Sequence, residues 1–177
     1  MSAPWADDKA IMDTDTRALV EQLAARFADR GYTLAVAESC TGGSLAAAIT
    51  DLAGVSLFFM GGVVSYADEV KQSLLGVPAE VLVAHGAVSE PTARAMAEGI
   101  RGRLGAHVGV GITGIAGPGG ATPTKPVGLV FIAVATPEGT RVRRDVWPGS
   151  RADIRRASVN AALELTLEAT EEPRRPR

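Results

Sequence analysis

The stretch Val36-Ala37-Glu38-Ser39-Cys40-Thr41-Gly42-Gly43 ends an apolar, β-like run at a hydroxyl, a thiol and two glycines. An Ala-rich segment with helical composition follows at residues 44–52. A strand that passes into a helix through such a turn exposes side chains and backbone N–H groups at the carboxyl edge of a sheet, where α/β proteins bind ligands. The stretch therefore predicts an α/β fold and marks the first place to look for chemistry.

Periodic patterns on both sides of this turn extend the alternation of helices and strands. Apolar residues at helical spacing, from Leu19 to Phe27, predict a helix that ends near Gly31, and the run at residues 32–37 reads as a buried strand. The sequence further predicts strands at residues 56–67, 107–113, 127–135 and 140–146, and helices at residues 68–75, 78–84, 89–104 and 151–169. The last two strands have the pattern of an antiparallel hairpin. We therefore predict a three-layer α/β/α sandwich with a mixed central sheet in a single domain.

The chain of 177 residues is long enough for one domain with a sizeable core. The periodic pattern starts after Asp13 to Asp15 and stops near residue 169. We therefore expect a flexible N-terminal arm at residues 1–14, the folded domain at residues 15–169 and a disordered tail at residues 170–177. We find no internal repeat and no linker within the domain.

The composition excludes several classes of function. A formal charge of −2 with 21% charged residues lacks the basic excess of nucleic-acid binders, so we expect no nucleic-acid partner. No apolar run approaches the roughly 20 residues of a membrane span, and residues 1–9 lack the apolar core of a signal peptide. The single cysteine, Cys40, cannot form an internal disulfide or a cysteine cluster for a metal. We expect a cytoplasmic protein without a membrane partner.

Ser39 is the leading candidate for a nucleophile, because it comes just after the strand end. The backbone N–H groups of Thr41, Gly42 and Gly43 could hold an oxyanion there. Cys40 is a rival, but adjacent residues that leave a strand point to opposite sides, so we expect at most one of the two to face a pocket. The alternatives are that Ser39 only caps the following helix and that Cys40 is a small buried hydrophobic residue.

A serine nucleophile needs a base, and lysine is the better candidate for it. Neither His85 nor His107 has a sequence context that suggests a catalytic triad. Only three of the eighteen basic residues are lysines: Lys9, Lys71 and Lys125. Lysine, unlike arginine, can lose its proton when buried. Lys71 lies five residues after Tyr66, so a strand-to-helix turn could bring phenol and amine to one pocket; the alternative is a solvated lysine on a helix.

A second glycine-rich segment, Gly114 to Gly120, follows the predicted strand at residues 107–113. It has the form of an anion cradle, although a plain connecting loop fits it as well. Ser89 and Arg151 each stand at the start of a predicted helix and could hold a phosphate, with helix capping and a solvated charge as the alternatives. Two glycine-rich loops that both follow strands favour a shared ligand crevice.

Five motifs occur in order along the chain: Ala37-Glu-Ser-Cys-Thr-Gly-Gly, Val64-Ser-Tyr-Ala-Asp-Glu-Val-Lys, His85-Gly-Ala-Val-Ser-Glu-Pro, Thr113-Gly-Ile-Ala-Gly-Pro-Gly-Gly and Lys125-Pro-Val-Gly. Together they resemble the CinA carboxy-terminal family, also known as PncC-type nicotinamide mononucleotide deamidases. The resemblance covers roughly residues 15–169. Five ordered motifs are far more specific than any one of them.

The resemblance implies an amidohydrolase that converts nicotinamide mononucleotide to nicotinic acid mononucleotide and ammonia in pyridine-nucleotide salvage. The family's catalytic serine, tyrosine and lysine fall on Ser39, Tyr66 and Lys71. No metal and no cofactor is implied. The regions that contact the nucleotide in the family fall on the turn at Ser89, on Thr113 and Gly114, and on Arg151. A homodimer is expected from the resemblance and from the Ala-rich helix faces.

Two departures from the family pattern leave other functions open. The family often has an acidic residue where this chain has Gly119, and a Gly-Asp-Arg where it has Gly149-Ser150-Arg151. Loss of these carboxylates puts substrate affinity in doubt. The alternatives are a nucleotide-binding or sensing module without turnover and an amidohydrolase for a different amide. The nucleotide-hydrolase domain of longer CinA proteins has no counterpart in these motifs, so no pyrophosphatase activity is expected.

Overall fold

The computed structural model describes residues 13–171, so most of the predicted arm and tail, residues 1–12 and 172–177, lies outside the described residues. Helix α1 (Thr14–Arg30) begins directly after Asp13, whose carboxylate accepts a hydrogen bond from the Thr16 N–H at 2.8 Å. It ends at Gly31, which has a φ of 62°. A carboxylate at the start and a left-handed glycine at the end are the residue types that these two positions favour.

The remaining elements follow in the predicted order. They are β1 (Leu34–Glu38), α2 (Ser44–Thr50), the 3-10 helix η1 (Val55–Leu57), β2 (Phe59–Val64), α3 (Asp68–Leu75), α4 (Ala79–His85), α5 (Glu90–Leu104), β3 (Val108–Gly114), β4 (Leu129–Thr136), β5 (Gly139–Val146) and α6 (Arg151–Ala169). No helix within residues 13–171 is long and apolar enough to cross a membrane.

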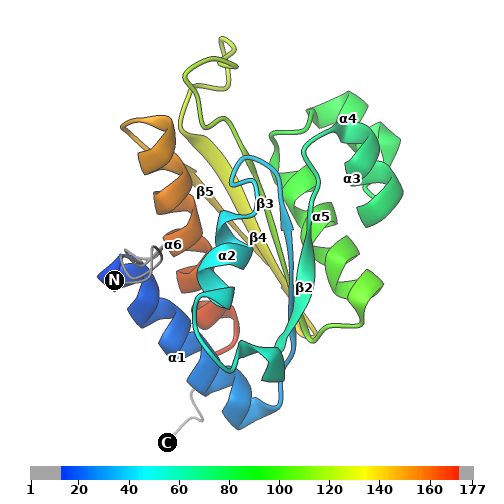
Figure 1. The fold of residues 1–177 in the computed structure, drawn as a ribbon. Coiled ribbons are helices and arrows are strands. Elements are labelled where there is room, and N and C mark those ends of the chain that lie inside the picture. Colours follow the sequence, from blue (N-terminus) through cyan, green and yellow to red (C-terminus); the bar gives the residue numbers. More distant parts are fainter. Residues whose placement is uncertain (1–12, 172–177) are drawn as a thin grey trace, which may run out of the picture.

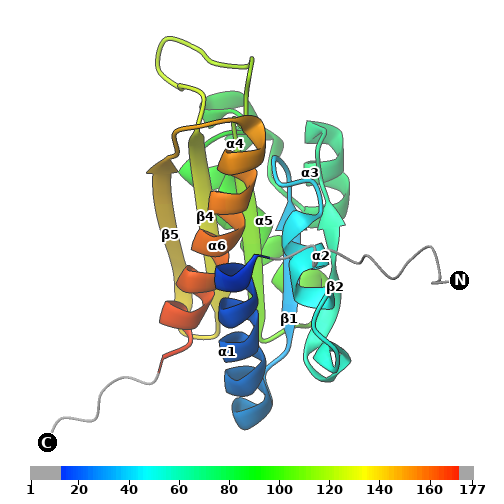
Figure 2. The same ribbon diagram turned by 60° about the vertical axis from the view of Figure 1, so that its left-hand side comes forward.

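One five-stranded sheet, in the order β2-β1-β3-β4-β5, forms the middle layer. Strand β1 is parallel to β2 and β3, whereas β4 is antiparallel to both β3 and β5. Figure 1 and Figure 2 show α1, α2 and α6 on one face and α3, α4 and α5 on the other. The predicted three-layer sandwich with a mixed sheet is confirmed.

The predicted strand at residues 56–67 is too long. Strand β2 covers only Phe59–Val64, and the residues before it form η1, in which the Phe58 N–H donates to the Val55 carbonyl at 3.0 Å. The apolar composition of this segment resembles a strand, but Gly54, with a φ of 89°, turns the chain into a 3-10 helix instead.

The two faces of the sheet carry side chains of different size. Alternation along β1 puts Leu34 and Val36 in the core beneath α1, α2 and α6, and Ala35 and Ala37 in the core beneath α5. On β3 the α5 face has glycines, and a Cβ on Gly111 would lie 2.5 Å from the Ala93 carbonyl oxygen of α5. Helix α5 therefore packs directly against the sheet backbone, which holds the ends of β1 and β3 in place.

The carboxyl ends of β1, β2 and β3 lie at the same edge because the three strands are parallel. Strand β5 runs the same way as β3, since each is antiparallel to β4, and it leads at this edge into α6. Ser39, Tyr66, Thr113 and Arg151 all follow or end these strands. The topology thus brings together residues that the sequence spreads over more than one hundred positions.

Candidate active site

A cavity of about 250 Å³ opens at this edge of the sheet. It is bordered by Ser39, Cys40, Tyr66, Lys71, Ala87, Val88, Thr113, Gly114, Ile115, Ala116, Gly117, Gly119, Gly120 and Arg151. Six residues that the sequence singled out as catalytic or substrate-binding therefore border one cavity: Ser39, Tyr66, Lys71, Thr113, Gly114 and Arg151. Four others do not border it: Thr41, Gly42, Gly43 and Ser89.

Ser39 is held by backbone hydrogen bonds at the strand end. Its N–H donates to the Ile112 carbonyl on β3 at 2.9 Å, and its carbonyl accepts the Gly42 N–H at 3.1 Å. The N-cap of α2 is Gly43, so the alternative that Ser39 caps this helix is wrong. Within residues 13–171 the Ser39 hydroxyl makes no hydrogen bond to another group, so it is available for chemistry in the cavity.

Lys71 is a buried lysine with 1% of its surface exposed. Its Nζ donates to the carbonyl oxygens of Ser65 and Tyr66, each at 3.0 Å, and lies 3.5 Å from Oδ1 of Asp68. The alternative of a solvated lysine on a helix is therefore wrong. The first turn of α3 folds the amine back over the end of β2 and beside the cavity that Ser39 borders.

Tyr66 stands at the mouth of the cavity and is 63% exposed. Its carbonyl, rather than its phenol, contacts Lys71. Among the described residues, the phenol makes no hydrogen bond with Ser39 or Lys71. The phenol is therefore free to meet a ligand that enters the cavity.

Cys40 borders the cavity together with Ser39, contrary to the expectation that only one of them would. Strand β1 ends at Glu38, so the alternation of a strand no longer applies to the two residues that follow. Burial raises the pKa of the Cys40 thiol to about 11. The thiol therefore stays protonated at neutral pH, which leaves the Ser39 hydroxyl as the stronger candidate for a nucleophile.

The turn after Ser39 does not offer the oxyanion donors that the sequence suggested. The Gly43 N–H donates to Oε2 of Glu38 at 3.1 Å, and the Gly42 N–H donates to the Ser39 carbonyl. Thr41, Gly42 and Gly43 all lie outside the cavity. The prediction that Gly42 and Gly43 hold a bound oxyanion is wrong, because the protein's own acceptors occupy both N–H groups.

Glu38 is the functional candidate that the sequence reasoning missed. It is 1% exposed, and besides Gly43 its carboxylate accepts the N–H groups of Leu45 at 3.0 Å and Ala46 at 2.9 Å. A signal was present in the sequence. An acidic residue in an otherwise apolar strand needs donors, and the start of the next helix supplies the nearest unpaired N–H groups.

Ser89 acts as a helix cap. Its Oγ accepts the Thr92 N–H at 3.3 Å and donates to the Gly86 carbonyl at 2.9 Å. The capping alternative, rather than the phosphate-binding one, describes its contacts. Thr113 does border the cavity, and its Oγ1 donates to the Ala87 carbonyl at 2.7 Å, which ties the end of β3 to the segment before α5.

The second glycine-rich segment forms one wall of the cavity. Arg151 Nη1 donates to the Gly117 carbonyl at 2.7 Å, and Lys125 Nζ donates to the His85 carbonyl at 2.7 Å, so both sides of this loop are anchored. Within residues 13–171, two basic residues, Lys71 and Arg151, and no acidic residue border the cavity. The cavity therefore suits a ligand with negative charge.

The two histidines lie away from this chemistry. His107 stacks on Tyr32 with ring centroids 5.3 Å apart and hydrogen-bonds Thr33, and His85 is an exposed residue at the end of α4. Residues 13–171 contain no group of three or more His, Cys, Asp and Glu side chains that could hold a metal ion. A lysine-assisted serine is the arrangement that the described residues offer.

The fold and the cavity define a class: a three-layer α/β domain with a ligand cavity around a serine and a buried lysine at the carboxyl edge of its parallel strands. The particular family follows from comparison with known proteins. The family model of the CinA C-terminal domain matches residues 16–170, and the chain belongs to this family.

Relatives and solved structures agree with this assignment. The chain is similar to a CinA-like protein of Gemmatimonas aurantiaca, at 53% identity over 86% of this chain and 35% of that protein. A CinA-like protein of Mycolicibacterium gilvum is 51% identical over 93% of this chain and 37% of its own length. The chain thus spans little more than a third of these relatives. The crystal structure of the competence/damage inducible protein CihA from Agrobacterium tumefaciens matches with a TM-score of 0.88 at 38% identity, over 90% of this chain and 98% of that one.

Proposed function

We propose that this protein hydrolyses the carboxamide of nicotinamide mononucleotide to the carboxylate and ammonia, with Ser39 as nucleophile and Lys71 as base. The observation that carries the proposal is the buried Lys71 amine at the wall of the same cavity as the Ser39 hydroxyl. A buried lysine that serves only structure is uncommon, and buried amines are suited to proton transfer. Membership in the CinA family supports the assignment.

The hydrogen bonds of Lys71 suit the role of a base. A neutral amine has two N–H bonds and one lone pair. The two carbonyls of Ser65 and Tyr66 accept two N–H bonds, which leaves the third position of the nitrogen for a proton from the nucleophile. The Asp68 carboxylate, 3.5 Å from Nζ, stabilises the ammonium that forms.

The reaction then proceeds in two halves. Ser39 Oγ attacks the carboxamide carbon as its proton passes to Lys71, directly or through the Tyr66 phenol, and the carbonyl oxygen takes up the negative charge. The tetrahedral intermediate collapses, its C–N bond breaks, and the Lys71 ammonium protonates the departing amide nitrogen, which leaves as ammonia. Water, deprotonated by Lys71, next attacks the acyl-serine, and the C–Oγ bond breaks as Ser39 regains its proton. The sum is amide plus water to carboxylate plus ammonium.

The charged and aromatic residues around the cavity indicate the class of substrate. Arg151 lies at the first residue of α6, beside the glycine-rich wall, where a guanidinium and a helix start both favour a phosphate. The exposed Tyr66 ring at the mouth offers a flat surface for the pyridinium. A mononucleotide with a carboxamide on a cationic ring satisfies both features.

A second candidate is a nucleotide-binding domain without turnover. The observation behind it is that Gly119 and Ser150 stand where the family often has carboxylates. Ser150 instead caps α6, with its N–H bound to Oδ2 of Asp153 at 3.0 Å. Asp153 thus supplies a carboxylate close to position 150, where the family often has one. This favours an enzyme over a binding domain without turnover.

Ammonia release from nicotinamide mononucleotide tests the proposal, with Ser39→Ala and the neighbouring Cys40→Ala as a matched pair. Loss of the nucleophile should lower kcat by about 10³-fold or more, whereas Cys40→Ala should stay within about threefold of the wild type. Nicotinamide riboside should show a raised KM because it lacks the phosphate. Equal rates for the two variants would refute the role of Ser39, and tight nucleotide binding without any hydrolysis would favour the second candidate.

A further inference from the structure

The nucleophile turn, residues 39–43, is held by a charged side chain on each side. On the inner side, the buried Glu38 carboxylate accepts the N–H groups of Gly43, Leu45 and Ala46 at 2.9 to 3.1 Å. The N-cap residue of α2 is a glycine without a side chain, so this carboxylate takes over the capping of a helix of only seven residues. The turn cannot move away from β1 without leaving a buried charge unpaired.

The Glu38 backbone also connects the turn to the base. The Glu38 carbonyl accepts the Ser65 N–H at 2.8 Å, and the Ser65 carbonyl accepts Lys71 Nζ at 3.0 Å. Ser39 follows Glu38 directly. A single run of hydrogen bonds therefore sets the position of the nucleophile relative to the amine.

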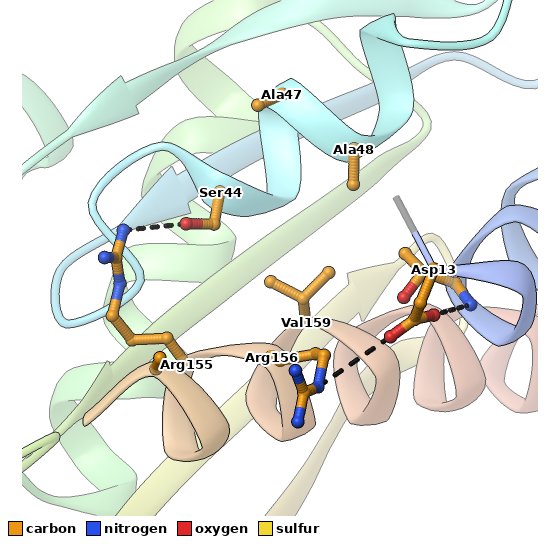
Figure 3. Close-up of a pocket in the computed structure, with 9 residues that line it drawn as sticks. Asp13, Ser44, Ala47, Ala48, Arg155, Arg156 and Val159 are labelled. Carbon is orange, nitrogen blue, oxygen red and sulfur yellow. Dashed lines mark hydrogen bonds and ion pairs between the residues drawn. The ribbon is translucent and has the colours of Figure 1, made fainter. Parts of the chain in front are cut away.

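On the outer side, Arg155 reaches from α6 to the same turn. Its Nη2 donates to the Thr41 carbonyl at 2.7 Å and to Ser44 Oγ at 2.8 Å, and its Nε donates to the Thr41 carbonyl at 3.3 Å. Figure 3 shows Arg155 extended to Ser44 across the end of α2, while the next residue, Arg156, turns toward Asp13. The two arginines border a cavity of about 260 Å³ between α1, α2 and α6, but only Arg155 touches the turn.

The N–H groups of the turn all have partners within the protein. The Thr41–Gly42 peptide is held at both ends, since its oxygen accepts from Arg155 and its N–H donates to the Ser39 carbonyl. The Gly43 N–H donates to Glu38. Burial raises the pKa of the Cys40 thiol, and hydrogen bonds from the Cys40 and Thr41 N–H groups oppose this rise, so both N–H groups have the sulfur as an acceptor. Of these two residues, Cys40 borders the cavity.

We propose that Glu38 and Arg155 are positioning residues, which hold the turn so that the Ser39 hydroxyl meets the carboxamide carbon of a substrate in the cavity. The proposal rests on the function proposed above. Occupation of the α2 N-terminus by Glu38 also keeps a substrate phosphate away from that helix and directs it to the Arg151 side of the cavity. Glu38 and Arg155 touch neither the substrate nor the reacting atoms, so they act through the geometry of the turn.

The test compares two pairs of variants. Glu38→Gln keeps the shape of the side chain but removes one acceptor oxygen and the charge, and its control is Asp13→Asn, which alters the carboxylate cap of α1 in the same way. Arg155→Lys keeps the charge but loses the two-point contact with Thr41, and its control is Arg156→Lys on the exposed side of the same helix. Each protein is assayed for kcat and KM and for backbone amide exchange.

In each pair, the variant and its control should give different results. In Glu38→Gln the Gly43, Leu45 and Ala46 amides should exchange faster than in the wild type, and kcat should fall about 10²-fold with KM changed less than about threefold, because the nucleophile loses its fixed orientation. Arg155→Lys should lower kcat about tenfold in the same pattern. Asp13→Asn and Arg156→Lys should keep the kcat of the wild type.

Two outcomes would overturn the proposal. Faster amide exchange in Glu38→Gln with an unchanged kcat would mean that the carboxylate serves stability alone, and an unchanged exchange rate would mean that it does not hold the turn. If Glu38→Gln fails to fold, Arg155→Lys decides by the same two readouts. A wild type without turnover would refute the proposed function separately, and the exchange data would still decide whether these side chains hold the turn.

Discussion

The two glycine-rich turns at the carboxyl edge of the sheet have similar compositions and opposite roles. The turn after β1 contains Gly42 and Gly43, and its N–H groups bind acceptors within the protein. The loop after β3 contains Gly114 to Gly120, and four of its glycines border the cavity. We call the first turn closed, because acceptors within the protein occupy its N–H groups. We call the second loop open, because it borders the cavity and a ligand can reach it.

The difference lies in the neighbouring side chains rather than in the glycines. The first turn has a buried carboxylate one residue before Ser39, and it satisfies the helix that follows. The second loop leads into no helix, and cations anchor it through backbone carbonyls. A glycine-rich turn therefore becomes an anion site only where no internal acceptor has already taken its N–H groups. In this fold the proposed nucleophile, Ser39, belongs to the closed turn, and the open loop is the one that borders the cavity with four glycines.

The largest expected effect comes from removal of the Lys71 amine, which we propose as the base for Ser39. Lys71→Met keeps the aliphatic stem and removes the nitrogen, so kcat should fall by about 10³-fold, within the usual range for loss of a general base. Arg103→Met is the control, because Arg103 contacts the Ser73 carbonyl at the surface and does not border the cavity. Steady-state ammonia release measures both. A similar loss in the two variants would argue against Lys71 as the base.

The thiol next to the nucleophile should be unreactive in the folded protein. The pKa of Cys40 is raised from 9.0 to about 11, so its thiolate fraction near pH 8 should be about 100-fold lower than in the unfolded chain. Alkylation by iodoacetamide, followed by mass spectrometry, should be slower by about that factor and should rise about tenfold per pH unit up to pH 11. Rapid alkylation at pH 7 would reopen Cys40 as the nucleophile.

The raised pKa of Cys40 also sets the direction in which the stability of the protein changes with pH. Because the folded pKa of Cys40 lies above the unfolded one, the neutral thiol favours the folded state fully below pH 9, and this contribution is lost as the pH rises toward 11. Cys40→Ala should remove this part of the alkaline loss of stability. Thermal unfolding of both proteins between pH 8 and pH 11 measures it.

Alanine should distinguish a glycine of the closed turn from a glycine of the open one. Gly43 has a φ of 96°, which an L-residue adopts at a cost of about 1–2 kcal/mol, so Gly43→Ala should lower the free energy of unfolding by about that amount. Gly119 has no positive φ and no atom within 4 Å of a Cβ, so Gly119→Ala should be neutral within about 0.5 kcal/mol. Urea unfolding measures both, and equal losses would contradict the comparison.

The smallest expected effect concerns the carboxylate cap that lies outside both turns. Hydrogen bonds from Thr16 lower the pKa of Asp13, so its contribution is present above the unfolded value of 3.8 and is lost as the pH falls through the folded value. Asp13→Asn should lower stability by less than about 1 kcal/mol at pH 7, and this difference should vanish near pH 2. Thermal unfolding from pH 7 to pH 2 checks the direction.

Sequence patterns predicted the fold, and they named as candidates several residues that the structure places around one cavity. The scarcity of lysine and the position of Ser39 after an apolar run made Ser39 and Lys71 candidates, and the resemblance to the CinA family then implied that they act as a pair. The boundary of β2 was missed, because a 3-10 helix and a strand share the same apolar composition over a few residues.

The partners of polar groups were the part that local patterns could not predict. Whether the Gly43 N–H binds a ligand or Glu38 depends on how β1 and α2 meet, and the contact of Arg155 with Thr41 joins residues 114 positions apart. Even so, a glutamate in an apolar strand just before a helix predicts that its carboxylate accepts the free N–H groups at the start of that helix. The roles that we propose for Glu38 and Arg155 depend on contacts that only the tertiary structure shows.

Hydroxylamine trapping tests the central claim most directly, because it reports an acyl-serine even when that intermediate does not accumulate. If Ser39 forms an acyl-enzyme with nicotinamide mononucleotide, added hydroxylamine should divert product from the acid to the hydroxamate in proportion to its concentration, without slowing ammonia release. Ser39→Ala should form no hydroxamate by this route. The acid as sole product at every hydroxylamine concentration, or equal hydroxamate from Ser39→Ala, would contradict a covalent role for Ser39.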